Sequence, residues 1–177
     1  MNLRTSTPIG HAIPVCLLFI ACHFNAKSQT VSAAPCSRPE FSQFNFWVGN
    51  WELTWNDTSR GNNNITVEMG NCLIHEHFSD TVNQYFGQSW SMYDTTSKKW
   101  KQTWVDNSGE YLDFQGGFEN GTMILQRSDI NKKGQPVLQR MIFFNIAKNT
   151  FDWDWESSTD GGVSWKSQWK IHYRRIL

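Results

Sequence analysis

The sequence lacks the charge runs and the long apolar stretches that mark several classes of protein. Its 177 residues carry 16 basic and 16 acidic side chains, with no basic block and no acidic tail. A nucleic-acid-binding surface of clustered lysine and arginine is therefore not expected. Beyond the N-terminal region, no stretch approaches the roughly 20 apolar residues that a membrane-spanning helix needs, so no transmembrane segment is predicted.

The N-terminus has the features of an export signal. Arg4 supplies a positive charge, and residues 12–22 form an apolar run that is too short to span a bilayer. Residues 26–28, Ala-Lys-Ser, fit the small-x-small cleavage pattern. We therefore predict a signal peptide over residues 1–28 and a secreted or periplasmic mature protein. The alternative is a lipoprotein anchored at Cys22.

Cysteine is scarce: the chain has four, and only Cys36 and Cys72 remain after the predicted cleavage. In an oxidising compartment an isolated pair predicts a disulfide, here between an N-terminal arm and the body of the domain. The alternative is two independent cysteines, one of them in the core. The mature chain, residues 29–177, suits one domain. We divide it into an extended arm over 29–40 and a barrel domain over 41–177.

Helical periodicity is almost absent, and most of the chain alternates apolar with polar residues. This period of two predicts strands that have one buried and one solvated face. Strands that follow one another closely, without helices between them, indicate an antiparallel barrel or sandwich. Asn120-Gly121 is the strongest hairpin signal, and a turn is also expected at Gly61–Asn64. Strands are predicted at 51–55, 65–69, 72–78, 84–93, 100–105, 111–118, 122–127, 137–145, 150–156 and 164–174.

One short helical segment precedes the first strand. Phe41, Phe44 and Trp47 recur at a period of three after Pro39, which predicts a short α- or 3₁₀-helix. Such a segment would plug one end of a barrel. Gly49 would then be the hinge at which the period changes from three to two.

The glycine and tryptophan that open the first strand carry a family resemblance. Gly49-x-Trp51 resembles the motif of the lipocalins and fatty-acid-binding proteins, which are calycins. Arg174 or Arg175 in the last strand looks like the arginine that packs on this tryptophan. The resemblance implies an all-β fold: a single antiparallel calycin-like, lipocalin-like barrel of about 8–10 strands with a short N-terminal helix.

A longer, ordered set of motifs is more similar to a family of exported bacterial proteins that has no assigned activity and carries a Phe-Trp-x-Gly-x-Trp motif. The resemblance implies a calycin-like barrel, and barrels of this kind often hold small apolar molecules. The motifs lie at Phe44–Trp51, Gly70–Glu76, Gly87–Ser89, Tyr93-Asp94, Lys99–Asp106, Ser158–Trp165 and Tyr173–Arg175.

The candidate binding site combines aromatic walls with a few polar anchors, as is typical of small-molecule cavities. We predict an exported barrel that binds a small apolar or aromatic molecule. All ten tryptophans lie in the mature chain, and some would line the cavity. The alternative is an interaction domain whose barrel is solidly packed. The predicted ligand-binding residues are Trp55, His75, His77, Trp90, Gln102, Trp104 and Trp153.

His75-Glu76-His77 is the main chemical cluster. On a strand the two histidines share one face and Glu76 takes the other. Alternation with Leu73 would point the histidines inward, whereas alternation with Ile74 would point Glu76 inward. The histidines could share a metal ion with a third ligand from elsewhere. Alternatively, Glu76 or His75 could act as the base of an isomerase or hydrolase, although no nucleophile–base pair is visible and no catalytic residue is assigned.

Other candidate sites favour structural roles. No cofactor is predicted; haem bound through His172 is an alternative, but the alternation of His172 with Lys170 points it outward. Asp152 and Asp154 are expected to be exposed, which disfavours an acid–base pair. Residues 158–165 resemble the Asp-box of sialidase propellers, and one copy in a chain of this length indicates a turn device rather than a propeller.

Overall fold

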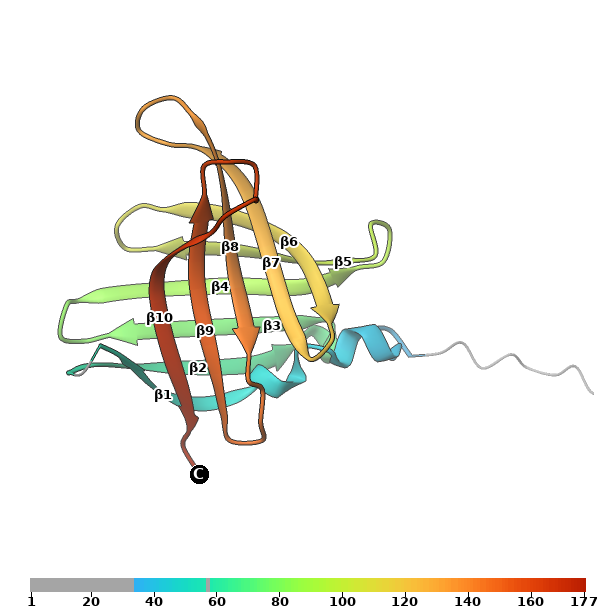
Figure 1. Cartoon of the computed structure of the whole chain (residues 1–177). Helices are drawn as coiled ribbons and strands as arrows, with labels where there is room; N and C mark the ends of the chain where they lie inside the picture. Colours follow the sequence, from blue (N-terminus) through green and yellow to red (C-terminus); the bar gives the residue numbers. More distant parts are fainter. Residues whose placement is uncertain (1–33, 57) are drawn as a thin grey trace, which may run out of the picture. The chain divides into compact units, whose positions relative to one another are not determined.

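The computed structural model describes residues 34–56 and 58–177, and in this part of the chain ten strands form a closed antiparallel barrel (Figure 1). These residues belong to one compact unit, Ala33–Leu177. The all-β barrel prediction is confirmed. The predicted signal peptide, the Cys22 anchor and the start of the N-terminal arm lie outside the described residues.

Each strand pairs with the next one along the chain, and β10 pairs back with β1 to close the barrel. In Figure 1 the strands β7–β10 cross steeply over β2–β5. The bounds are β1 Gly49–Trp55, β2 Ser59–Glu68, β3 Leu73–Asp80, β4 Tyr85–Asp94, β5 Lys99–Asp106, β6 Tyr111–Glu119, β7 Thr122–Ile130, β8 Pro136–Phe144, β9 Thr150–Ser158 and β10 Lys166–Arg175.

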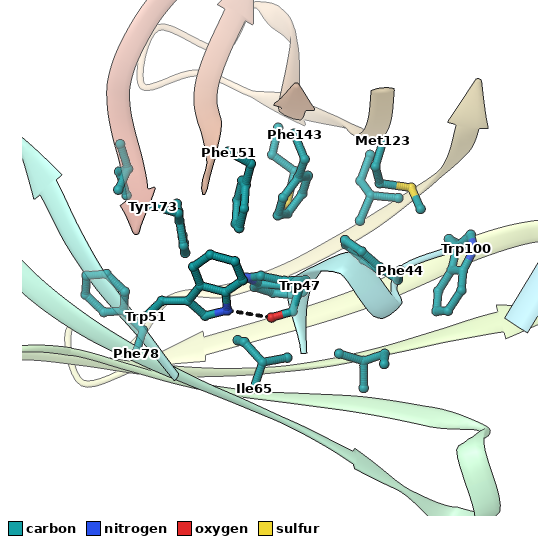
Figure 2. Packing of buried hydrophobic residues seen from close by; sticks show 14 of the residues in the cluster. Phe44, Trp47, Trp51, Ile65, Phe78, Trp100, Met123, Phe143, Phe151 and Tyr173 are labelled. Carbon is teal, nitrogen blue, oxygen red and sulfur yellow. Dashed lines mark hydrogen bonds between the residues drawn. The ribbon is translucent and has the colours of Figure 1, made fainter. Parts of the chain in front are cut away.

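Two short 3₁₀ segments, η1 (Pro39–Ser42) and η2 (Asn45–Trp47), close one end of the barrel. Phe44 lies between them and is completely buried. Its ring stacks on Trp47 and meets two strands edge-on, at Trp100 and Phe143, with ring centroids 5.0–5.2 Å apart (Figure 2). The predicted plug is therefore present, and its aromatic side chains merge with the barrel core.

Trp51 joins the plug to the last strand. Its indole nitrogen donates to the carbonyl of Trp47 at 2.6 Å (Figure 2). The guanidinium of Arg175 lies 4.1 Å from the Trp51 ring and donates to two carbonyls of the segment before β1, at 2.6 and 2.9 Å. Arg174 instead points outward and pairs with Glu52. Of the two candidate arginines, Arg175 is therefore the one that packs on the tryptophan.

Gly49 is required at the start of β1 for two reasons. Its φ of +131° is a conformation that residues with a side chain rarely adopt. In addition, a Cβ atom at Gly49 would lie 2.3 Å from the guanidinium of Arg175. The absence of a side chain at Gly49 therefore lets the Arg175 guanidinium lie against the first residue of β1.

The predicted disulfide is confirmed between Cys36 and Cys72, with Cα atoms 5.2 Å apart. Cys72 follows the 3₁₀ turn η3 (Met69–Asn71), directly before β3. The bond ties the segment before η1 to the wall of the barrel. Closing a loop of this length stabilises a folded chain by about 3–4 kcal/mol in the chain-entropy view. Among the described residues, no helix is long and apolar enough to cross a membrane.

The turn predicted at Gly61–Asn64 is wrong, because these residues lie inside β2. They pair with β1 on one side and with β3 on the other, so the backbone groups of the asparagines are held by two neighbouring strands. Strand pairing thus overrides the local preference of Gly and Asn for turns. As a result Asn63 points into the barrel and is only 2% exposed.

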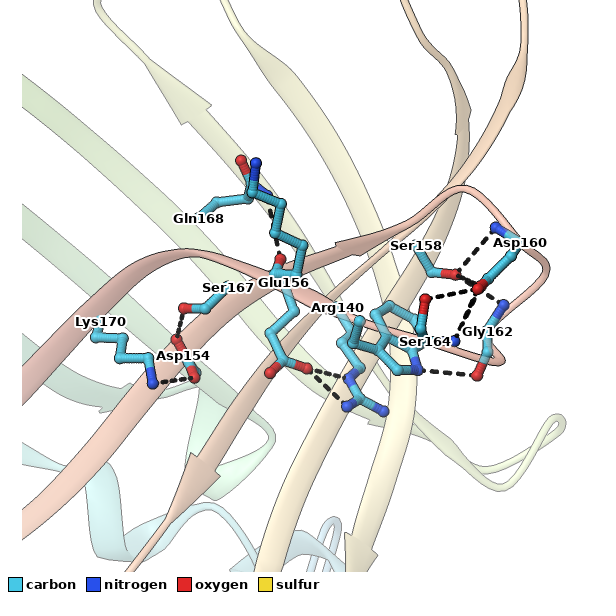
Figure 3. A network of polar contacts seen from close by, with 12 residues as sticks. Arg140, Asp154, Glu156, Ser158, Asp160, Gly162, Ser164, Ser167, Gln168 and Lys170 are labelled. Carbon is cyan, nitrogen blue, oxygen red and sulfur yellow. Dashed lines mark hydrogen bonds and ion pairs between the residues drawn. The ribbon is translucent and has the colours of Figure 1, made fainter.

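The hairpins at two other predicted turns are confirmed. Asn120 and Gly121 connect β6 to β7 with φ of 51° and 78°, as a tight two-residue turn requires. The Asp-box-like segment connects β9 to β10, where Asp160 accepts from the hydroxyls of Ser158 and Ser164 and from the Ser164 amide (Figure 3). These hydrogen bonds lower the pKa of the Asp160 carboxyl. The motif serves as a turn.

The expectation that Asp154 is exposed is wrong. Asp154 points to the outer face of β9, but its neighbours cover it: Ser167 donates to it at 2.6 Å and Lys170 lies 3.7 Å away (Figure 3). Asp152 is half-buried and contacts His172 at 2.7 Å. Both acids therefore have outer-face partners and take no part in the barrel interior.

Candidate functional site

The barrel is hollow, with an interior cavity of about 640 Å³. At one end the cavity reaches Trp47 of the plug. At the other end it is bordered by the loops β5–β6, β7–β8 and β9–β10, which contribute Ser108, Lys132 and Thr159. The cavity therefore has a closed floor at the plug and a mouth at the opposite loops.

Aromatic and aliphatic side chains make most of the cavity wall. They come from the inward positions of strands β3, β5, β6 and β8–β10, where the period-two pattern places apolar residues. The apolar wall consists of Phe78, Trp104, Leu112, Phe114, Val137, Met141, Phe143, Trp153, Trp155, Trp169 and Ile171.

Trp104 is positioned by a glycine on the neighbouring strand. A Cβ atom at Gly87 would lie 2.1 Å from the Trp104 ring, so the absence of a side chain lets the indole lie against β4. The Trp104 indole nitrogen donates to Asp106 at 2.9 Å. The ring is thereby fixed against the wall with its polar edge satisfied.

Three of the predicted ligand-binding residues, Gln102, Trp104 and Trp153, line the cavity. Trp55 also points inward and is buried, but it does not line the cavity. Its ring packs against that of Trp169, which does line the cavity, with 5.4 Å between the ring centroids.

The placement of His75, His77 and Trp90 in the cavity is wrong, because all three lie on the outer face of the barrel. His75 is held there by Glu68 on Nδ1 at 2.9 Å and by Gln88 on Nε2 at 3.0 Å. Its ring stacks on Trp90, which is 37% exposed. These residues form an external cluster without access to the interior.

Strand parity explains this arrangement. On β3 the inward positions are Ile74, Glu76 and Phe78, so the histidines between them face outward. On β4 the inward positions near Trp90 are Ser89 and Ser91. Small polar residues therefore take the inner face of β4, and the large aromatic residue takes the outer one.

Glu76 is the polar centre of the interior. It is 6% exposed and lines the cavity. Its carboxyl accepts from Asn63 Nδ2 at 2.6 Å and from Ser89 Oγ at 2.5 Å. Gln102 Nε2 in turn donates to Ser89 Oγ at 3.2 Å and to Ser91 Oγ at 2.8 Å. Burial raises the pKa of Glu76 to about 7, although these hydrogen bonds oppose the rise.

Four residues of this polar network were not predicted from the sequence: Asn63, Ser89, Ser91 and Tyr173. Asn63 is the most central of them, because it contacts both Glu76 and Tyr173. Its Nδ2 also donates to the Tyr173 hydroxyl at 3.3 Å, and its buried Oδ1 has no hydrogen-bond partner in the described structure. Burial and the nearby Glu76 raise the pKa of Tyr173 well above its ordinary value. Asn63 pairs directly with Trp51 of β1, whose side chain is buried, so both residues face the interior. The sequence could have identified Asn63 only if β2 had been predicted to begin at Ser59.

The mouth carries a second polar group. Asp106 accepts from Tyr85 and Trp104, at 2.8 and 2.9 Å, and from Ser108 at 2.6 Å. Burial alone would raise the pKa of Asp106, but these hydrogen bonds outweigh it and hold the pKa at about 2. Burial, followed by the bond to Asp106, raises the pKa of Tyr85. Asp106 is therefore an anion at neutral pH.

Metal and haem ligation find little support in the geometry. Among the described residues, no three His, Cys, Asp or Glu side chains are grouped so that they could hold a metal ion. Both ring nitrogens of His75 are occupied by Glu68 and Gln88. His172 lies on the outer face of β10 beside Asp152, away from the cavity.

No protein-family model matches this chain, and no curated protein matches it. The resemblance to calycins and to exported bacterial proteins therefore stays a prediction that rests on the motifs.

Proposed function

We propose that the protein is an exported β-barrel that binds a small, mainly apolar or aromatic molecule in its interior. The observation that carries this proposal is the cavity of about 640 Å³, with aromatic walls from several strands and a polar centre at Glu76 and Gln102. Small-molecule sites commonly have volumes of about 300–1,000 Å³ and a few fixed polar groups in an apolar lining. The protein matches this description.

Export is the second part of the proposal. The Cys36–Cys72 disulfide is the kind of bond that persists in oxidising compartments. Sequencing the N-terminus of the mature protein tests this directly. A chain that starts at Gln29 supports simple cleavage, and a lipid-modified Cys22 supports the anchored alternative. An uncleaved, unmodified chain would contradict both.

Binding is tested with N-phenyl-1-naphthylamine, a neutral aromatic probe whose fluorescence rises in apolar sites. The chain offers two tryptophans for a matched comparison, Trp104 in the cavity wall and Trp90 on the outer face. Trp104→Leu should weaken probe binding about 3- to 10-fold, because an aromatic contact contributes about 0.5–1.5 kcal/mol. Trp90→Leu should leave it within about twofold.

Two results would contradict the binding proposal. One is the absence of probe binding together with the absence of any small molecule in native mass spectrometry of the purified protein. The other is an equal effect of the two leucine variants, which would place the probe on the outside of the barrel.

A second candidate function is proton transfer by Glu76. A buried carboxyl with a pKa of about 7 can act as a general base near neutral pH. Incubating the protein with its bound molecule in D₂O tests this function. Deuterium on a carbon of that molecule, absent with Glu76→Gln, would support catalysis, and unchanged mass would leave binding as the function. His75 is not available for this role because it lies outside the cavity.

A further inference from the structure

The Glu76 carboxyl has neutral hydrogen-bond partners, Asn63 and Ser89. Asn63 of β2 and Ser89 of β4 donate hydrogen bonds to this carboxyl, and Asn63 also donates to the hydroxyl of Tyr173 on β10. In the part of the chain that the structure describes, no lysine, arginine or histidine forms an ion pair with Glu76. His75 lies on the opposite face of β3, where it pairs with Glu68. A buried acid without a counter-charge is costly unless something else supplies one.

The hydrogen bonds around Glu76 are oriented for the ionised form. Asn63 and Ser89 both donate to the carboxyl, and Gln102 donates to Ser89. A carboxylate accepts hydrogen bonds only, so this arrangement suits a negative charge. Glu76 and Gln102 both line the cavity, so a bound molecule can reach them.

The whole cavity has an excess of negative charge. With Glu76 ionised, four acidic and two basic side chains line it, which gives a net charge of −2. One of the two bases is already neutralised, because Arg127 contacts Asp129 at 2.7 Å. A cleft with one sign of charge and apolar walls attracts ligands of the opposite sign. The charged lining residues are Glu76, Asp106, Glu110, Arg127, Asp129 and Lys132.

Aromatic rings line the same cavity as Glu76. Trp47, Phe78 and Tyr173 are among its lining residues, and Trp47 also has a buried indole N–H without a partner among the described residues. The faces of such rings attract cations, by about 0.5–2 kcal/mol each depending on solvation. A carboxylate together with aromatic rings is a suitable surrounding for an ammonium group.

We infer that the ligand is an organic cation, an aromatic or apolar body that carries an ammonium group, and that Glu76 is the counter-ion of this group. The inference rests on the proposed binding function and specifies its ligand class. The aromatic body lies against the tryptophan wall, and the ammonium group donates to the Glu76 carboxylate.

The proposed pairing of an ammonium group with Glu76 makes the affinity for an amine depend on pH. Burial raises the pKa of Glu76 to about 7, so the empty protein holds a proton there below neutral pH. Binding an ammonium group requires the ionised carboxylate and releases that proton. Affinity for an amine should therefore rise as the pH increases from 5.5 to 8, since a primary amine stays protonated over this range, like lysine. The other titratable group at this end, Tyr173, keeps its proton throughout because its pKa is raised.

The test uses three probes with one aromatic body: 2-(1-naphthyl)ethylamine, the corresponding alcohol and the corresponding carboxylate. Isothermal titration calorimetry at pH 8 should show the amine binding at least about tenfold more tightly than the alcohol, because charge-assisted hydrogen bonds exceed neutral ones. The carboxylate should bind most weakly. At pH 5.5 the preference for the amine should shrink severalfold.

Two glutamine variants complete the experiment. Glu76→Gln should lower amine affinity to the level of the alcohol and leave the alcohol within about twofold. Glu119→Gln removes a negative charge at the exposed β6–β7 turn and should preserve the preference. An alcohol that binds the wild type as tightly as the amine at pH 8 overturns the inference without any variant. If N-phenyl-1-naphthylamine still binds in that case, only the ligand class is wrong; if no probe binds, the binding function fails as well.

Discussion

Replacing Glu76 with glutamine should remove a large pH dependence from the folding stability. The native carboxyl has a pKa of about 7, against an ordinary value of 4.5. Between these two pH values the native state binds more protons than the unfolded state, so the free energy of unfolding falls as the pH rises. The stabilising contribution of protonated Glu76 is complete below pH 4.5 and is lost as the pH passes through 7.

The pKa difference corresponds to about 3 kcal/mol, at roughly 1.4 kcal/mol per pH unit within the window. Glutamine has nearly the same shape, and its amide can still accept from Asn63 and bond to Ser89. The stability of Glu76→Gln relative to the wild type should therefore increase by about 3 kcal/mol between pH 4.5 and pH 8.

Urea unfolding followed by tryptophan fluorescence measures this difference at several pH values. Because the result is a difference between two proteins, titration of the other groups largely cancels. Glu119→Gln is the matched control, and as a surface change it should stay within about 0.5 kcal/mol of the wild type. A stability difference between Glu76→Gln and wild type that does not change with pH would refute the reasoning.

Three further predictions concern the frame around the cavity, each read from urea midpoints. Cys36→Ser should lower stability by about 3–4 kcal/mol, and a reducing agent should do the same to the wild type. Gly116→Ala should lower the free energy of unfolding by about 1–3 kcal/mol, because the new Cβ would lie 1.8 Å from a β7 carbonyl. Gly117→Ala should lower it less, because a Cβ there would meet open space. Arg175→Lys should cost about 1–3 kcal/mol through lost stacking and hydrogen bonds, and Arg174→Lys under about 0.5.

The contrary outcomes are equally specific. A reducing agent that leaves the wild-type midpoint unchanged would contradict the role of the disulfide. Equal costs of the two alanine variants, or of the two lysine variants, would show that the close approach at β7 and the stacked arginine do not stabilise the barrel as described.

The frame of the barrel was largely predictable because its signals are local. Alternating residues identified the strands, Asn120-Gly121 identified its hairpin, and the period of three before Gly49 identified the plug. Each of these patterns depends on side chains that are close together in sequence. The disulfide was predictable for a different reason, since only two cysteines follow the predicted cleavage site.

The interior was less predictable because it depends on contacts across strands. Leu73 and Ile74 are both buried, so the sequence around Glu76 does not identify the inner face of β3. Asn63 looks like a turn residue until its pairing with both neighbouring strands is known. On β4 the usual placement of large apolar residues inside and polar residues outside is reversed near Trp90. Ser89 and Ser91 face inward there, and Ser89 hydrogen-bonds to Glu76.

The closure of the barrel has a consequence for the order of folding. All strand pairs except one join consecutive strands, and the exception, β1 with β10, brings Trp51 opposite Arg175. Hairpins between consecutive strands form over short loops, whereas closure must bring together opposite ends of the domain, which slows folding. We therefore expect the cavity to be completed late in folding. A folding intermediate without docked β10 would already contain most of the tryptophan wall, yet it would have no enclosed interior in which to hold a ligand.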